Sequence, residues 1–145
     1  MTTPIRILIA DDHAIVRHGL RQILSDSEDM VVSGEATSGV QALQMARQGE
    51  WDVVLMDVSM PDKNGIDTLK QLKQSRPELP ILMLSGYAED QYAINLLRAG
   101  AAGYLNKEAA STQLVGAIRT VVRGRKFISP ALAQILADGV TGDAD

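Results

Sequence analysis

Five polar residues that close short apolar runs could together carry out phosphoryl chemistry. They are Asp11 and Asp12 after the first run, Asp57 after the third, Ser85 after the fourth and Lys107 near the end of the fifth. Neighbouring carboxylates repel one another unless a cation lies between them, and an all-oxygen ligand set suits a hard ion such as Mg²⁺. A carboxylate can itself be the nucleophile that accepts a phosphoryl group, with a metal ion and a lysine stabilising the transferred charge. We therefore expect a magnesium-dependent aspartyl phosphate site if the fold brings these side chains together.

Taken singly, each of these residues has an ordinary structural explanation. An aspartate at a strand end is more often a helix N-cap, a serine there commonly forms a turn, and a lysine there is usually solvated. It is much less probable that such residues close four of the five runs by chance. The prediction of a site therefore depends on the set and not on any single member.

The apolar runs predict the strands of a parallel sheet. They are short and continuous, as expected for strands buried on both faces, and segments with apolar residues at helical spacing separate them. A strand–helix unit repeated five times predicts an α/β domain with right-handed crossovers and helices on both faces. In such a domain the functional residues gather at the carboxyl ends of the strands. The predicted strands are Ile5–Ala10, Met30–Ala36, Trp51–Met56, Leu79–Leu84 and Ala102–Leu105.

Capping residues and helical propensity indicate where the helices lie. Asn64 and Ser111 are the expected N-caps of the third and fifth helices. The second and fourth helices are expected over Ser38–Gln48 and Glu89–Ala99.

The character of the sequence changes from Arg123, where a basic stretch begins. Ser129 and Pro130 then suit the N-cap and first position of a short helix, expected over about 130–138. We therefore expect one domain over residues 1–123 and a linker over residues 124–145.

Composition limits the classes of protein to which this chain can belong. With 145 residues, 46% of them hydrophobic and 22% charged, it suits one folded domain and not a disordered chain. A net charge of −4 disfavours a general nucleic-acid binder, and the absence of cysteine excludes disulfides and thiolate zinc sites. No run approaches the roughly 18 apolar residues of a membrane span. The N-terminus lacks the basic segment and cleavage site of a signal peptide, so we expect a cytoplasmic protein with no membrane partner.

Four motifs make the chain resemble the receiver domain of bacterial two-component response regulators over about Pro4 to Val122. The resemblance implies a flavodoxin-like (βα)5 doubly wound sheet with strand order 2-1-3-4-5. It also implies a sensor histidine kinase as the partner that donates a phosphoryl group, and Mg²⁺ as the cofactor. The motifs are ILIADDH at Ile7–His13, VVLMDVSMPDKNG at Val53–Gly65, ILMLSG at Ile81–Gly86 and AGAAGYLNK at Ala99–Lys107.

The resemblance assigns a role to each matched acidic residue. Asp57 corresponds to the phosphoacceptor, and Asp12 to the carboxylate that binds the metal directly. Asp11 would act on the ion through water, and Ser59 would contribute its backbone carbonyl. In addition, Gly65 would help to shape the loop that follows the third strand.

The resemblance further implies a conformational switch. Ser85 corresponds to the hydroxyl that follows the phosphoryl group, Lys107 to the lysine that pairs with it, and Tyr104 to an aromatic residue that rotates on activation. The alternative for Tyr104 is an ordinary half-buried strand residue. Many receivers carry proline after this lysine, whereas Glu108 follows it here, and the geometry of that peptide stays open.

Two further stretches resemble the NarL/FixJ, or LuxR-type, subfamily. They are DDHAIVRHGL at Asp11–Leu20 and GRKFISPALAQIL at Gly124–Leu136. That resemblance implies a linker toward a helix-turn-helix DNA-binding domain that this chain does not contain, so that DNA would be contacted only through that domain. A stand-alone receiver remains the alternative. Val115 and Val122 lie to one side of the core stripe of the fifth helix, where they either line the edge of the core or belong to a self-association face of helices one and five. The fourth helix, fifth strand and fifth helix form the other candidate face.

Other functions fit these residues less well. A hydrolase of the haloacid dehalogenase type would carry an Asp-x-Asp pattern after the first strand, whereas Asp11 and Asp12 are adjacent. A flavodoxin-like cofactor binder needs a phosphate-binding loop at that place, where this chain is acidic. A pseudo-receiver that only binds proteins is disfavoured because Asp12, Asp57, Ser85 and Lys107 are all present. We therefore expect a signalling protein and not an enzyme.

Overall fold

Five parallel strands form the central sheet of the computed structural model, which describes residues 3–86 and 91–143. The strand order is β2-β1-β3-β6-β7, which is the predicted order 2-1-3-4-5 once the two short strands β4 and β5 are set aside. The strands of the sheet are β1 (Ile5–Ala10), β2 (Met30–Ala36), β3 (Val53–Asp57), β6 (Ile81–Ser85) and β7 (Gly103–Asn106).

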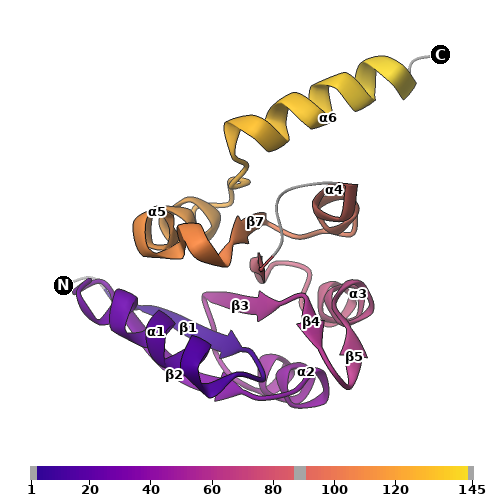
Figure 1. The fold of residues 1–145 in the computed structure, drawn as a ribbon. Helices are drawn as coiled ribbons and strands as arrows, with labels where there is room; N and C mark the ends of the chain where they lie inside the picture. The colour runs from indigo at the N-terminus through magenta and orange to yellow at the C-terminus, as the bar shows by residue number, and fades with distance from the viewer. Residues whose placement is uncertain (1–2, 87–90, 144–145) are drawn as a thin grey trace.

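Helices cover both faces of this sheet (Figure 1). Helices α1 (Ala14–Ser25) and α5 (Ala110–Val122) pack on one face. Helices α2 (Gly39–Gln48), α3 (Gly65–Ser75) and α4 (Gln91–Arg98) pack on the other face. The doubly wound α/β fold is therefore confirmed.

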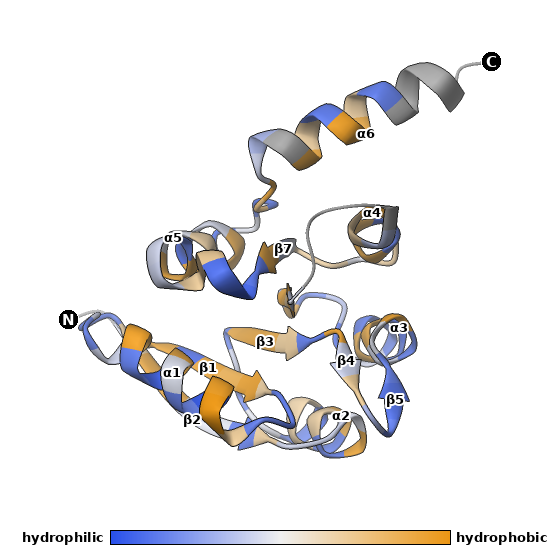
Figure 2. Ribbon diagram, viewed as in Figure 1, coloured by the Kyte–Doolittle hydropathy of each residue, from blue (hydrophilic) through white to orange (hydrophobic). Residues whose placement is uncertain are grey.

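Alternation along the strands builds two separate cores. In β1, Ile7 and Ile9 contact the α1 and α5 side, whereas Leu8 contacts the α2 to α4 side. Successive side chains of a strand point to opposite faces, so a continuous apolar run fills both cores. Figure 2 shows this run as hydrophobic colour over β1 and β3, and hydrophilic colour on the short strand β5 (Lys63–Asn64).

Three strands begin and end later than predicted. The strand predicted over Trp51–Met56 is β3, Val53–Asp57, and the one predicted over Leu79–Leu84 is β6, Ile81–Ser85. The last strand is shifted by one residue in the same direction, to Gly103–Asn106. Asp57 and Ser85 stay in the parallel register, opposite Leu84 and Asn106, although their side chains are polar. The functional residues are thus the last residues of their strands.

The start of α5 contradicts the predicted cap at Ser111. A 3₁₀ turn over Lys107–Ala109 precedes the helix, and the Asn106 side chain accepts a hydrogen bond from the Glu108 backbone N–H at 2.8 Å. The helix therefore begins at Ala110 and leaves Ser111 exposed in its first turn. The cap at Asn64 is confirmed, because its side chain accepts from the Ile66 N–H at 2.8 Å. The predicted start of the fourth helix at Glu89 lies outside the described residues.

Helix α6 (Pro130–Asp143) is longer than the expected span of about 130–138. Its start is as predicted, since the Ser129 hydroxyl accepts from the Leu132 N–H at 3.1 Å. Leu132 is fully buried in the core on the α4 side of the sheet, and α6 contacts α4 before the chain runs away from the domain (Figure 1). Within the described residues, no helix combines the length and the apolar character that crossing a membrane requires.

Candidate functional site

The carboxyl edge of the sheet brings three of the predicted residues into contact. Asp11 follows β1, Asp57 ends β3, and Lys107 follows β7. The Lys107 Nζ atom lies 3.1 Å from Asp11 Oδ2 and 3.3 Å from Asp57 Oδ1. Parallel strands that start at one edge of a sheet must end together at the other, which explains the convergence of residues up to 96 positions apart in the chain (11 to 107).

The carboxylates of this site are buried with unsatisfied oxygen atoms. Asp11 is 1% exposed and Asp57 is 2% exposed. In the part of the chain that the structure describes, Asp57 Oδ2, Asp11 Oδ2 and Asp12 Oδ1 are buried and accept no hydrogen bond. Asp11 Oδ2 has only its ion pair with Lys107. Buried polar atoms normally have partners, so Asp57 Oδ2, which has none among the described residues, and the acidic groups beside it fit a hard cation that the oxygens would coordinate.

His13 adjoins the acidic residues in a way that the sequence analysis did not predict. Ligand atoms of Asp11, Asp12, His13 and Asp57 all lie within 4.8 Å of one another. The His13 backbone N–H donates to Asp11 Oδ1 at 2.8 Å, and its Nδ1 lies 3.2 Å from Asp12 Oδ1. The sequence signal that could have identified His13 is its position directly after Asp11 and Asp12. The side chain is 63% exposed, so it borders the cluster from the solvent side.

Two groups of the site, Asp57 and Lys107, have raised pKa values. Burial raises the pKa of Asp57, and the neighbouring Asp11 charge adds to this, while the Ser59 N–H and the Lys107 charge partly oppose it. Burial alone would lower the pKa of Lys107, but its bonds and attraction to Asp11 and Asp57 outweigh this and leave the pKa raised. Lys107 is therefore a permanent cation beside a carboxyl group whose ionisation is costly.

A small hairpin follows Asp57 and presents Ser59 to the site. Strand β4 (Ser59–Met60) pairs with β5 (Lys63–Asn64) in antiparallel register. The Ser59 side chain is exposed, and its backbone N–H donates to Asp57 Oδ1 at 3.2 Å. Gly65 closes the loop so tightly that a Cβ there would lie 2.6 Å from the Val58 carbonyl oxygen. The chain after β3 is therefore bent back on itself beside the acidic cluster.

The two predicted switch residues, Ser85 and Tyr104, are buried on the neighbouring strands β6 and β7. Ser85 ends β6 and is 0% exposed, and Tyr104 in β7 is 1% exposed in the core that contains α4. Tyr104 is thus fully buried and not half-buried as the alternative would have it. The described residues contain no cis peptide, so the Lys107–Glu108 peptide is trans.

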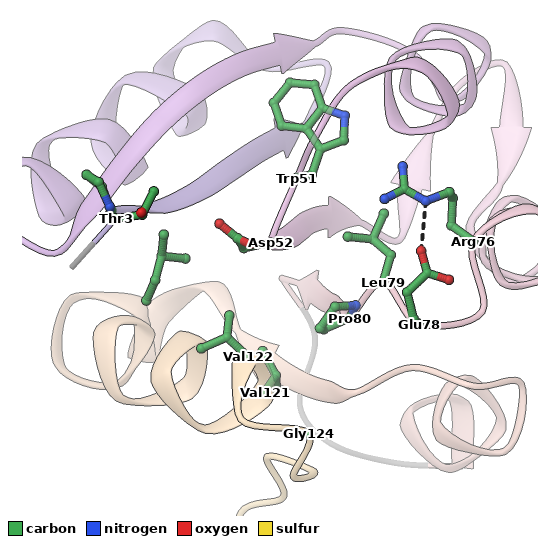
Figure 3. A pocket seen from close by; sticks show the side chains of 12 residues that line it. Thr3, Trp51, Asp52, Arg76, Glu78, Leu79, Pro80, Val121, Val122 and Gly124 are labelled. Atoms are coloured by element: carbon green, nitrogen blue, oxygen red, sulfur yellow. Dashed lines mark hydrogen bonds and ion pairs between the residues drawn. The ribbon is translucent and has the colours of Figure 1, made fainter.

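A hollow of about 460 Å³ lies at the opposite, amino edge of the sheet (Figure 3). Trp51, Asp52 and Pro80 border it just before their strands, and Val122 borders it from α5. Figure 3 shows the Arg76 guanidinium paired with Glu78 at its rim. None of the predicted site residues lines this hollow, so it is separate from the acidic cluster.

Comparison with known proteins places this geometry in a family. The sequence pattern of the response regulator receiver domain family matches residues 7–119. Response regulator GacA of Pseudomonas viridiflava is 43% identical over 133 residues, which cover 92% of this chain and 62% of that protein. Response regulator UvrY of Escherichia coli K12 is 41% identical over 133 residues, covering 92% of this chain and 61% of that protein. The chain therefore spans less than two thirds of the length of these relatives.

Solved structures agree with the sequence comparison. A LuxR-family two-component response regulator from Aurantimonas sp. SI85-9A1 superimposes with a TM-score of 0.87 at 31% identity, covering 96% of this chain and 99% of that one. The isolated receiver domain of RcsB from Salmonella enterica, solved with the phosphomimetic BeF₃⁻, gives a TM-score of 0.82 at 29% identity and covers 91% of this chain and 98% of that one. The chain belongs to the response regulator receiver domain family and is of the LuxR type.

Proposed function

We propose that this chain receives a phosphoryl group on Asp57 from a sensor histidine kinase. The observation that carries the proposal is the buried Asp57 carboxylate, which has Lys107 at 3.3 Å on one oxygen and no hydrogen bond on the other within the described residues. In the proposed step an Asp57 oxygen forms a bond to phosphorus as the bond to the donor breaks. Burial, with repulsion from Asp11, raises the pKa of Asp57, and a bound cation would offset the cost of this buried charge.

Mg²⁺ fits the residues that surround Asp57. Asp12 and Asp57 would hold it directly, Asp11 through a water molecule, and Ser59 through its backbone carbonyl. The close approach of the three aspartates and the Asp57 oxygen that has no partner within the described residues support this assignment. When bound, the ion would balance carboxylate charge and the charge of the incoming phosphoryl oxygens. Lys107 is already positioned as a second cation, and it would follow the phosphoryl oxygens once Asp57 is modified.

The conformational response would pass through Ser85 and Tyr104. The Ser85 hydroxyl, at the end of the strand next to β3, would donate to a phosphoryl oxygen. Tyr104 would then change its packing in the core that it shares with α4 and α6. Phosphorylation would thus shift the population between two arrangements of one packed core.

Residues 1–123 would form the receiver, and residues 124–145 a linker toward a helix-turn-helix DNA-binding domain. DNA would be contacted only through that domain. A protein that meets both a kinase's cytoplasmic part and DNA would act in the cytoplasm. Of the two candidate dimer faces, the one that includes α4 carries α6 in this structure. The face formed by α1 and α5 is therefore favoured, and Val115 and Val122 lie partly buried at its edge.

Intact-mass spectrometry after incubation with acetyl phosphate tests the proposal. One phosphoryl adduct that requires both Mg²⁺ and Asp57 is expected for the wild-type chain, and Asp57→Ala should show none. An adduct of equal yield on Asp57→Ala, or on wild type in excess chelator, would contradict the assignment. A stand-alone receiver would give the same adduct, whereas a pseudo-receiver would remain unmodified.

A further inference from the structure

Asp62, at the tip of the β4–β5 hairpin, caps the first turn of α2 from outside the helix. Its Oδ1 accepts from the Gly39 N–H at 2.8 Å, and its Oδ2 accepts from the Val40 N–H at 3.0 Å. The first backbone N–H groups of a helix have no partner within the helix, and a carboxylate there is also favoured by the helix dipole. These two bonds hold the pKa of Asp62 below its usual range, so the cap is ionised at neutral pH.

The start of α2 is capped by two residues with separate tasks. Ser38 caps from within, since its hydroxyl accepts from the Gln41 N–H at 3.1 Å. Asp62 satisfies the two preceding N–H groups from a segment 23 residues away in the chain. Only the second contact ties the helix to the hairpin. Helix α2 could therefore keep the Ser38 cap and still lose its connection to the hairpin through Asp62.

The hairpin and α2 approach each other without room for a side chain. A Cβ at Gly39 would lie 2.8 Å from Lys63 Cβ, closer than such atoms approach in proteins. The glycine and the two hydrogen bonds therefore belong to one close junction. Its partners are the first residue of α2 and the two residues, Asp62 and Lys63, that follow Pro61 in the hairpin.

The hairpin needs this external support because it is very short. Its register contains two pairs, Ser59 with Asn64 and Met60 with Lys63, and isolated two-stranded hairpins are marginal in water. One end of it, at Asn64, is fixed as the N-cap of α3. The other end, at Ser59, donates its N–H to Asp57. The tip is held by Asp62.

We propose that Asp62 is a positioning residue that, by anchoring the hairpin to α2, holds the Ser59 backbone at the phosphorylation site and so raises the affinity for Mg²⁺. The inference rests on the proposed function, in which the Ser59 carbonyl is a metal ligand. Residues that orient metal ligands typically change metal affinity by about 10- to 100-fold when they are removed. Asp62 acts only through the backbone, so its effect is expected near the lower of these values.

The test compares Asp62→Ala with Ser38→Ala, because both remove a cap from the same helix but only the first releases the hairpin. Titration calorimetry with MgCl₂ is expected to show an affinity loss of about 10-fold for Asp62→Ala and less than about 2-fold for Ser38→Ala. Both variants should have a lowered melting temperature, which checks that the helix cap was lost in each. Asp62→Asn, which keeps one acceptor oxygen, should recover part of the affinity and remains informative if the alanine variant is poorly folded.

The outcomes separate this inference from the function on which it rests. Wild-type Mg²⁺ affinity in both Asp62 variants, or an equal loss in the Ser38 and Asp62 variants, would overturn the role of Asp62 and leave the phosphoacceptor site intact. A wild-type chain that binds no Mg²⁺, or binds it equally after Asp12→Ala, would overturn both. Faster amide exchange at residues 59–64 in Asp62→Ala, with unchanged exchange there in Ser38→Ala, would support the positioning role independently of the metal.

Discussion

Lys107 Nζ lies 3.1 Å from Asp11 Oδ2 and 3.3 Å from Asp57 Oδ1, so one ammonium group bridges two buried carboxylates. The lysine comes from the turn after β7, and the carboxylates come from two other strands. This bridge holds the carboxyl edge of the sheet together before any phosphoryl group arrives. Phosphorylation of Asp57 would change what the ammonium contacts.

Lys107→Ala should keep slow phosphorylation but weaken the structural response to it. Asp57 remains as the nucleophile, whereas the cation that would follow the phosphoryl oxygens is gone. We expect the acetyl phosphate reaction to slow by about 10- to 100-fold, corresponding to roughly 1.4–2.7 kcal/mol of lost charge stabilisation. The response is measured as backbone amide shift changes on phosphorylation. Lys70→Ala, which removes an exposed lysine of α3, is the control, and an unaltered shift pattern in Lys107→Ala would refute the assigned role.

Asp57→Asn should raise the thermal stability of the metal-free chain at neutral pH. Burial raises the pKa of folded Asp57, so this group contributes stability below its unfolded pKa and loses it as the pH rises through the folded pKa. The asparagine carries no such cost, and its melting temperature should exceed that of wild type by on the order of a few degrees. The difference should shrink as the pH falls and Asp57 becomes protonated. Differential scanning calorimetry in chelator, with the exposed Glu28→Gln as control, measures it, and a gap that is constant with pH would speak against the buried charge.

The strands could be predicted from the sequence because a strand buried on both faces leaves a continuous apolar run. The carboxyl ends of the strands could not be predicted, because the polar residues Asp57 and Ser85 interrupt the apolar runs, whereas their backbones still pair with the neighbouring strands. The approach of Asp11, Asp57 and Lys107 followed from the topology alone.

The features that the sequence did not predict correctly also have local causes. Ser111 is a sound N-cap by residue type, but Asn106 starts a 3₁₀ turn earlier and the helix is already formed at Ser111. The contact of Asp62 with Gly39 joins segments that no periodicity relates, so only the folded chain shows it. The length of α6 was underestimated because Gly139 and Gly142 disfavour a helix and residues 139–143 carry no apolar stripe.

The ion pair between Asp29 and Arg119 should stabilise the chain above about pH 4 and lose this effect progressively as the pH falls further. Arg119 Nε and Nη2 contact the two carboxylate oxygens of Asp29 at 3.0 Å each, joining the turn before β2 to α5. The Arg119 hydrogen bonds hold the pKa of Asp29 below its ordinary value of 3.8. A carboxyl group with a depressed folded pKa adds stability above its unfolded pKa and loses it as the pH falls through the folded pKa.

Melting temperatures of wild type and Arg119→Ala should therefore differ slightly at pH 7, and the difference should vanish in strong acid. Both side chains are nearly half exposed, at 46% and 44%, so the effect is small and should also decrease in high salt. Arg123→Ala, an exposed arginine just past the end of the same helix, is the matched control. A difference between wild type and Arg119→Ala that persists at low pH would assign the effect to helix packing and not to the ion pair.

Leu132→Ala should release α6 from the domain without unfolding the sheet. Leu132 is fully buried in the same core as Tyr104, and α6 contacts α4. Truncating a buried leucine costs about 2–5 kcal/mol, and this loss weakens the contact between α6 and the core, so the helix can detach while the sheet stays folded. Amide exchange over residues 130–143 should then accelerate strongly, with β3 unaffected, whereas Gln134→Ala on the exposed side of α6 should change neither.

The same variant tests whether α6 reports the state of the phosphorylation site. If modification of Asp57 alters the packing of Tyr104, the wild-type chain should show changed exchange in α6 after treatment with acetyl phosphate and Mg²⁺. Leu132→Ala should lose that change while it still gains the phosphoryl adduct, because α6 is no longer docked on the core that Tyr104 shares with α4. An exchange change in α6 that survives in Leu132→Ala would show that the signal reaches the linker by another route, through α5 and the segment around Phe127 that pairs with β7.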